Sequence, residues 1–130
     1  SNGGSLMLGA YAVGNTGSMS EPITFLPSMS DLIEVADDST VSRTVLRADG
    51  ARVVLFSFDA GQELTEHTAA MPVLLSVLDG RLEIAAAGQR VELVPGGVVH
   101  LAARVPHEVH ALEPSRMALT MLDARIEAHA

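Results

Sequence analysis

Three observations predict an all-β sandwich or barrel for this chain. Turn signals built on Gly, Pro and Asp recur about every eight to twelve residues, a spacing typical of such folds. The segments between the turns are short and rich in β-branched and other apolar residues. No strand alternates with a long amphipathic helix, so a parallel sheet with crossover helices is not expected. The chain has 130 residues, 48% of them hydrophobic, which suffices for one domain with a modest core.

The elements are expected in a simple order. A short helical turn is predicted over 30–35, with Ser30 as its N-cap and acidic residues near its start. Eight or nine strands should follow. The clearest of them span 41–47, 52–58, 73–78, 81–86, 89–94, 98–102, 108–112 and 116–122.

Two Asp-Gly pairs are the strongest turn signals. Asp49-Gly50 and Asp79-Gly80 each follow a predicted strand and precede another. Tight hairpins prefer such pairs because both positions tolerate a positive φ. We therefore expect a hairpin at each pair.

Composition excludes several partners and sites. The net charge is −8, all eight basic residues are Arg, and they are scattered, so nucleic acid would be repelled. There is no Cys, which excludes disulfides and thiolate metal sites. The apolar runs are far shorter than the roughly 20 residues of a membrane-spanning helix, so no membrane partner is expected. An Arg-only, Ala-rich composition suggests a bacterium, and the lack of a signal-peptide pattern suggests a cytoplasmic protein.

The chain divides into two parts. Residues 1–20 are rich in Gly, Ser and Asn and are expected to be an extended arm or an expression remnant, with Met19 as a possible native start. Residues 21–130 are expected to form the barrel domain. A partner subunit is one anchor that would hold the arm, so a homodimer is expected.

Two stretches bounded by glycine each contain a histidine in a set position. The first, GQELTEHTAAMPVLLSVLDG, begins at Gly61, has His67 after five residues and ends at Gly80. The second, GGVVHLAARVPHEVHA, contains Gly96 and His107. In spacing these stretches resemble the paired signature motifs of the cupin superfamily. The resemblance implies a double-stranded β-helix, that is, a jelly-roll barrel of RmlC-like type, with at most a short N-terminal helix and its site inside the barrel.

The chain departs from the cupin pattern at the positions of the metal ligands. The family supplies two His and one Glu from its first motif and one His from its second. Here His67 and His107 match, but Ala69 stands at the second His and Val73 stands at the Glu. Ala111 replaces the usual Asn of the second motif.

A divalent metal (Zn, Fe, Mn or Ni) is one hypothesis for the two histidines. Two imidazoles alone need a third donor, because catalytic zinc usually has three protein ligands and nonheme iron has two His and a carboxylate. Glu63 lies four residues before His67 and would share its face in a regular strand, which makes it the best candidate carboxylate. His110 should face away from His107 unless a bulge intervenes. The alternative interpretation is that both histidines are retained polar residues of the barrel mouth.

A second hypothesis is a small-molecule pocket without a metal. If the strand alternates regularly, Ala69, Met71 and Val73 share one apolar face with Leu75. A small, mostly apolar ligand would then be held by His67 and His107 as polar anchors, although plain core packing explains the same pattern. Three functions therefore stay open: a small-molecule-binding module, a metal-dependent oxygenase, isomerase or decarboxylase, and a mainly structural dimer. Whether the protein is an enzyme is undecided at this level.

Overall fold

The computed structural model describes residues 21–128, and these residues form two antiparallel β-sheets. One short 3-10 helix, η2, spans Ser30–Leu32. The strands that follow are β1 (Thr40–Ala48), β2 (Ala51–Phe58), β3 (Glu63–His67), β4 (Val73–Asp79), β5 (Leu82–Ala86), β6 (Gln89–Leu93), β7 (Val98–Leu101), β8 (His107–Ala111) and β9 (Ser115–Leu122).

The strands are distributed over a five-stranded sheet and a four-stranded sheet. The five-stranded sheet has the order β1-β2-β9-β4-β7, and the four-stranded sheet has the order β3-β8-β5-β6. Consecutive strands repeatedly cross from one sheet to the other, which is the winding of a jelly roll. The predicted all-β jelly-roll class is confirmed.

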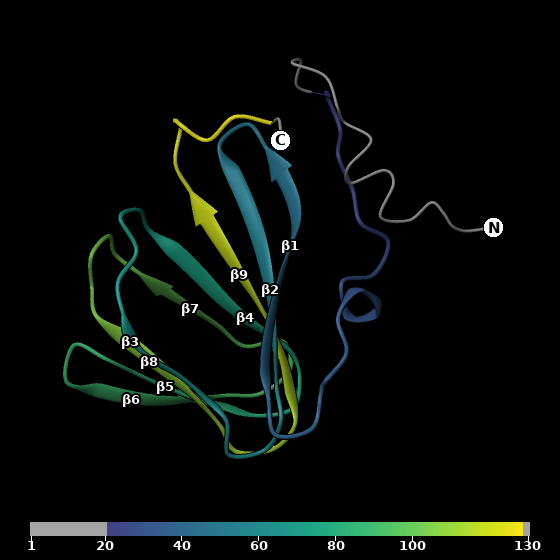
Figure 1. Ribbon diagram of the computed structural model, residues 1–130. Coiled ribbons are helices and arrows are strands. Elements are labelled where there is room, and N and C mark those ends of the chain that lie inside the picture. Colours follow the sequence, from purple (N-terminus) through teal and green to yellow (C-terminus); the bar gives the residue numbers. More distant parts are fainter. Residues whose placement is uncertain (1–20, 129–130) are drawn as a thin grey trace.

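Figure 1 shows that the two sheets meet at one end and diverge at the other. We call the first the closed end; it carries the connections 59–62, 80–81, 94–97 and 112–114. The second is the open end, with the connections 49–50, 68–72, 87–88 and 102–106. The open end is where the candidate site lies.

The main core fills the space between the sheets. Alternate residues of β4, namely Val73, Leu75 and Val77, are almost completely buried and face Leu82 and Ile84 of β5 within one apolar cluster. This period of two is what a sheet with one buried face requires. Fully burying a side chain of this size stabilises the fold by about 1.5–3 kcal/mol.

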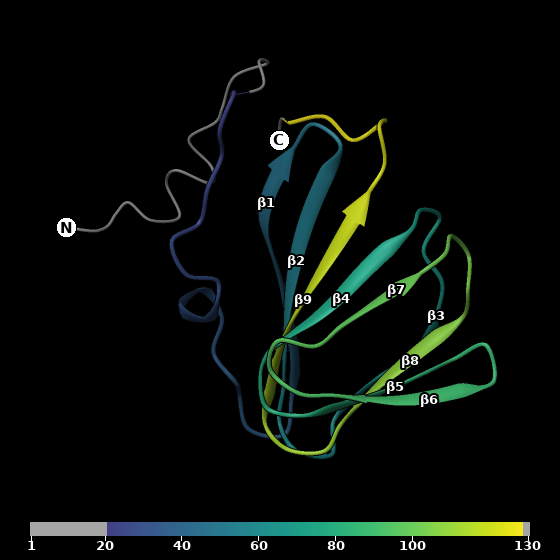
Figure 2. The ribbon, with the colours of Figure 1, turned by 180° about the vertical axis from the view of Figure 1, so that it is seen from behind.

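A second, smaller cluster lies on the outer face of the five-stranded sheet. Ile33, from the N-terminal segment, packs there with Val45, Leu55 and Ala118. Figures 1 and 2 show the segment before β1 running along the outside of this sheet in both views. The segment thus covers apolar residues that would otherwise face water.

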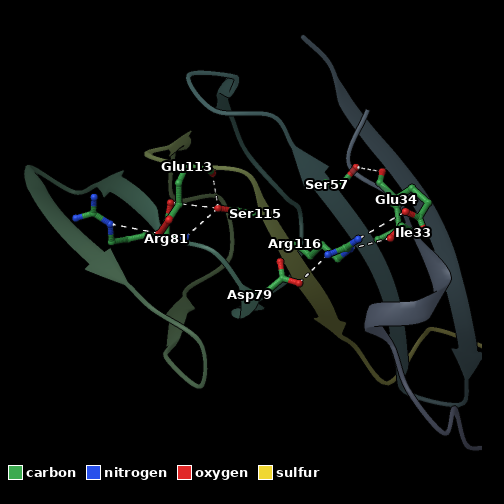
Figure 3. Close-up of polar contacts among 8 residues, drawn as sticks. All are labelled: Ile33, Glu34, Ser57, Asp79, Arg81, Glu113, Ser115 and Arg116. Atoms are coloured by element: carbon green, nitrogen blue, oxygen red, sulfur yellow. Dashed lines mark hydrogen bonds and ion pairs between the residues drawn. The ribbon is translucent and has the colours of Figure 1, made fainter. Parts of the chain in front are cut away.

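Arg116 fastens this segment to the sheet. Its Nε donates to the carbonyl oxygen of Ile33 at 2.8 Å and its Nη1 donates to the Asp79 carboxylate at 2.7 Å (Figure 3). Ser57 Oγ donates to the Glu34 carbonyl oxygen at 2.8 Å. The side chains of Arg116 and Ser57 therefore both bond the backbone of this segment to the outer face of the sheet.

The two Asp-Gly pairs behave differently. Asp49-Gly50 joins β1 and β2, which pair antiparallel as the predicted hairpin, with a register shift between Thr44 and Leu46. The hairpin prediction for Asp79-Gly80 is wrong, because β4 and β5 lie in different sheets. Gly80 has a φ of +85°, and a Cβ there would collide with Ser115 Oγ and the Pro114 carbonyl oxygen. Glycine is required there for a close approach between segments far apart in the sequence.

The N-terminal helix is shorter than predicted. Its N-cap is Met29, without a side-chain cap, rather than Ser30, and Ile33 is already extended with φ −150° and ψ 141°. The extended backbone directs Ile33 and its carbonyl oxygen to the sheet, and these contacts outweigh local helix propensity. The predicted arm, residues 1–20, lies outside the described residues. Within residues 21–128, no helix has both the length and the apolar character needed to cross a membrane.

Candidate functional site

His67 and His107 lie next to each other at the open end. They are cross-strand partners in the β3–β8 ladder, and their ring centroids are 4.3 Å apart with an interplanar angle of 59°. His107 is 2% exposed, whereas His67 is half-buried. The structure thus brings together the two histidines that the motif spacing singled out.

A hydrogen bond to the carbonyl oxygen two residues earlier in the chain orients each of the two rings. His67 Nδ1 lies 3.0 Å from the carbonyl oxygen of Thr65, and His107 Nδ1 lies 3.0 Å from that of Val105. A carbonyl oxygen only accepts, so each Nδ1 carries the proton and donates it. In a neutral ring the Nε2 atom then presents a lone pair.

The connection before His107 is held in an unusual conformation. Arg104, three residues before His107, has a φ of +65°. Its backbone N–H donates to the Ala69 carbonyl oxygen at 2.7 Å, which ties the 102–106 connection to the 68–72 connection. A non-glycine residue in this region costs about 1–2 kcal/mol. This tie positions the Val105 carbonyl that orients His107.

The electrostatics of His107 favour the neutral ring. Burial lowers the pKa of His107; the hydrogen bond to Val105 raises it in part, and nearby His67 lowers it again. The Nε2 atom of His107 is buried and has no hydrogen-bond partner. The site therefore contains an unsatisfied hydrogen-bond acceptor that is shielded from water.

Glu63 does not share the face of His67. The β3–β8 pairing shifts register between Leu64 and His67, so the strand contains a bulge. Glu63 instead lies on the outer face, where its Oε1 is 3.3 Å from Nδ1 of His110. The prediction for Glu63 assumed regular alternation, and the extra residue of a bulge reverses that alternation. His110, as predicted, faces away from His107.

The predicted apolar face over residues 69–75 is only partly correct. Val73 and Leu75 lie in β4 and point into the core, but Ala69 and Met71 belong to the connection before it. The strand begins only after Pro72, which cannot donate a ladder hydrogen bond. Ala69 still packs against the main core, so an apolar side chain replaces a donor there.

A cavity of about 320 Å³ at the open end is lined by residues next to His107. It lies between β5 and β6 of one sheet and β7 of the other, and its lining is apolar except for Gln89 and His100. Ala86, which lines it, is the cross-strand partner of His107, and Val105 lines it as well. His100 received no role in the sequence analysis because it sits in an apolar run.

The described residues do not fit a complete protein-ligated metal site. The two Nε2 atoms are suitable donors, but between residues 21 and 128 no group of three or more His, Asp or Glu side chains could hold a metal ion. Ala69 and Val73 offer no donor atom, and Glu63 is engaged on the outer face. Two imidazoles fall short of the three protein ligands usual for a catalytic centre.

Comparison with known proteins decides the fold. A cupin superfamily protein from Desulfitobacterium hafniense superposes with a TM-score of 0.69 at 24% identity, over 82% of this chain and 96% of that one. An RmlC-like cupin from Desulfovibrio desulfuricans superposes with a TM-score of 0.64 at 23% identity, over 80% and 97%. This chain has the cupin fold. Sequence comparison finds no matching family model and no matching curated protein.

The cupin fold is shared by proteins with different activities. Salicylate 1,2-dioxygenase from Pseudoaminobacter salicylatoxidans superposes with a TM-score of 0.60 at 15% identity, over 68% of this chain and 26% of that one. Fold likeness at this level of identity does not transfer an activity.

Sequence reasoning missed Arg52, which also belongs to the open end. Arg52 is on β2 opposite Met121, and the alternate residues Phe56 and Phe58 pack in or against the main core. Its side chain therefore starts from the inner face of the five-stranded sheet. The signal was available, because the alternation of residues 52, 54, 56 and 58 places one charged residue on an otherwise apolar face.

Proposed function

We propose that this cupin-fold protein binds a small, mostly apolar molecule between its sheets at the open end, with His67 and His107 as polar anchors. The observation that carries the proposal is the buried, unpartnered Nε2 of His107, together with an apolar cavity lined by Ala86 and Val105, the two residues that pair with His107.

The unpartnered nitrogen has an energetic cost. A buried polar atom without a hydrogen bond destabilises a fold by about 1–3 kcal/mol, and a Leu side chain at the same position would avoid this cost. A ligand that donates a hydrogen bond to this nitrogen removes the penalty on binding. The neutral ring predicts a hydroxyl or N–H group on the ligand at this point.

The cavity supports a ligand of modest size. Pockets for small molecules typically measure about 300–1,000 Å³ and combine an apolar lining with a few polar groups, and this cavity is at the lower limit of that range. Its lining by Ile84, Val91 and Val99 suits an aliphatic or aromatic body. No Trp is available to stack on a sugar or a base.

A divalent-metal-dependent enzyme of oxygenase, isomerase or decarboxylase type is the second candidate. The free Nε2 atoms of two adjacent imidazoles, each fixed by a carbonyl on Nδ1, favour it, since metal-binding histidines are commonly oriented in this way. It requires a third donor that the described residues do not supply.

The test is a fragment screen on ¹⁵N-labelled protein, read by amide shifts in two-dimensional NMR. We expect fragments with an apolar body and a hydroxyl or N–H group to move the amides of Ala86, Val105 and His107. The variant His107→Leu should lose these effects, while His110→Leu, which changes an outer-face histidine, should keep them. Fragments that bind only elsewhere, or no binding at millimolar concentration, would overturn the proposal.

A measurement of bound metal distinguishes the two candidate functions. Wild type and the double variant His67→Ala plus His107→Ala are purified from medium supplemented with Zn, Fe, Mn and Ni and submitted to elemental analysis. Near-stoichiometric metal in wild type, lost in the double variant, would make the enzyme the better interpretation. Metal at background level in both samples supports the binding protein. The homodimer and the cytoplasmic location stay predictions; light scattering in solution tests the former.

A further inference from the structure

The open end contains a guanidinium group with incomplete hydrogen bonding. Arg52 Nη2 lies 2.9 Å from the sulfur of Met121, a weak acceptor, and Arg52 Nε is buried without any hydrogen-bond partner. Arginine is almost always charged, and a buried donor of a charged group is costly to leave unpaired. The Nε–H of Arg52 therefore has an unused hydrogen bond among residues 21–128.

A second arginine lies directly opposite. Arg47 of β1 is the cross-strand partner of Arg52 in the β1–β2 ladder. Directly opposed residues of antiparallel strands project to the same face, and like charges in this arrangement destabilise the pair. Among residues 21–128 neither arginine has a carboxylate partner, although the chain contains 16 acidic residues. Two opposed guanidinium groups without a counter-charge are the arrangement that an anion stabilises.

These arginines and the histidines lie at the same end of the barrel. Met121 is opposite both Arg52 and Val73, and the backbone N–H of Leu122 donates to the Pro72 carbonyl oxygen at 3.1 Å. The 68–72 connection, which contains Pro72, begins directly after His67. The arginines and the histidines therefore belong to the two facing sheets at the same end of the barrel.

We infer that the ligand of this cupin-fold protein is a small carboxylate with an apolar body, and that Arg52, assisted by Arg47, binds its carboxylate group. The inference rests on the proposed function, because it names the chemical class that the interior site takes. A guanidinium fork matches the two oxygens of a carboxylate, and the apolar body would pack against Met121, which lies opposite both Arg52 and Val73 in the five-stranded sheet. Phosphate is disfavoured because no helix N-terminus or glycine-rich backbone cradle lies among these residues in the described part of the chain.

The test compares acids with their neutral amides. 4-Hydroxybutanoate, 6-hydroxyhexanoate and 4-hydroxybenzoate, which all carry the hydroxyl donor that the proposed function requires, are titrated against their amides by amide-shift NMR, with inorganic phosphate as a further probe. Each pair has nearly the same shape and differs in charge. We expect the acids to bind at least about tenfold more tightly than the amides, in keeping with charge-assisted pairing.

Variants locate the effect. Arg52→Met should reduce the preference for acids to about twofold or less, and Arg47→Met should reduce it in part. Arg52→Lys retains the charge without the fork and should lie between Arg52→Met and wild type. Arg90→Met is the matched control, because it removes the same charge from an outer-face residue that pairs with Glu83. If Arg52→Met fails to fold, Arg47→Met and Arg52→Lys still decide the question.

Each result has a distinct meaning. Equal binding of acids and amides at the site would overturn the carboxylate assignment and leave the proposed function standing. Stronger binding of phosphate than of any acid would overturn the assignment in favour of another anion. Absence of binding by acids and amides alike would overturn the assignment and the proposed function together.

Discussion

Arg116 and Arg52 project from adjacent strands, β9 and β2, yet their surroundings differ completely. Arg116, near the closed end, donates to the Ile33 carbonyl and to Asp79 and lies 3.8 Å from Glu34 (Figure 3). Arg52, at the open end, has a sulfur atom near one nitrogen and nothing at Nε. The chain thus contains one arginine that holds the fold together and one whose coordination is incomplete. Complete pairing indicates a structural role, and incomplete pairing in an interior position indicates a site for a ligand.

The two ends of the barrel show the same contrast. At the closed end, Ser115 Oγ accepts from the Arg81 N–H at 2.9 Å and donates to the Glu113 carbonyl at 2.7 Å, so a buried hydroxyl is fully used. At the open end, His107 uses one of its two ring nitrogens. If this contrast is correct, substitutions at the closed end should cost stability and substitutions at the open end should cost binding.

The largest expected effect is that of Gly80→Ala. The new Cβ would meet Ser115 and the Pro114 carbonyl in a backbone with positive φ, so the free energy of unfolding should fall by about 3 kcal/mol. Denaturant titration measures it. Gly88→Ala is the control, because its φ is +76° but no atom lies within 4 Å, and it should cost only about 1 kcal/mol. Equal effects of the two variants would contradict the close approach at Gly80.

Arg116→Met should have the next largest effect. It leaves Asp79 and the Ile33 carbonyl without their donor, and we expect a loss of about 2 kcal/mol in the free energy of unfolding, measured by denaturant titration. Proteolysis should also become faster within residues 21–35, because their attachment to the sheet is weakened. A variant as stable as wild type would show that this network contributes little.

Stability should depend on pH through His107. Its pKa is lowered in the folded state by burial, so the unfolded chain binds a proton at a higher pH than the folded chain does. The contribution is fully present above the unfolded pKa of about 6.5 and is lost as the pH falls below it. Melting temperatures between about pH 7.5 and about pH 5 should fall less in His107→Leu than in wild type. Parallel curves would show that burial of His107 does not govern this range.

Arg52→Met is expected to have the smallest effect on stability. The variant keeps an apolar stem against Met121 and removes the unpaired nitrogen, so the free energy of unfolding should change by less than about 0.5 kcal/mol. Comparison with Arg116→Met in the same titration is the direct test of the contrast between the two arginines. A loss as large as that of Arg116→Met would assign Arg52 a structural role.

The sequence predicted much of the fold because strand alternation and turn residues are local signals. It also predicted that His67 and His107 belong together, since motif spacing fixes which residues of β3 and β8 face the interior. The role of the Asp79-Gly80 turn could not be predicted from local sequence. Gly80 is required because the backbone there passes close to Ser115, which is far away in the sequence. Glu63 was misplaced because a bulge has no reliable sequence signature. The inner-face position of Arg52 was predictable from its alternation with Phe56 and Phe58. A charged residue near the end of a strand is, however, usually exposed to solvent, so the sequence does not single it out.

The position of β9 has a consequence for synthesis on the ribosome. This strand, the last within residues 21–128, lies in the middle of the five-stranded sheet, between β2 and β4. Until β9 has emerged from the ribosome, β2 and β4 each have an edge without its native partner strand. Unpaired strand edges promote pairing between chains. The nascent protein should therefore aggregate most readily just before β9 emerges. A chain truncated before β9 should therefore be insoluble, whereas pairing of β9 with β2 and β4 closes both edges at once.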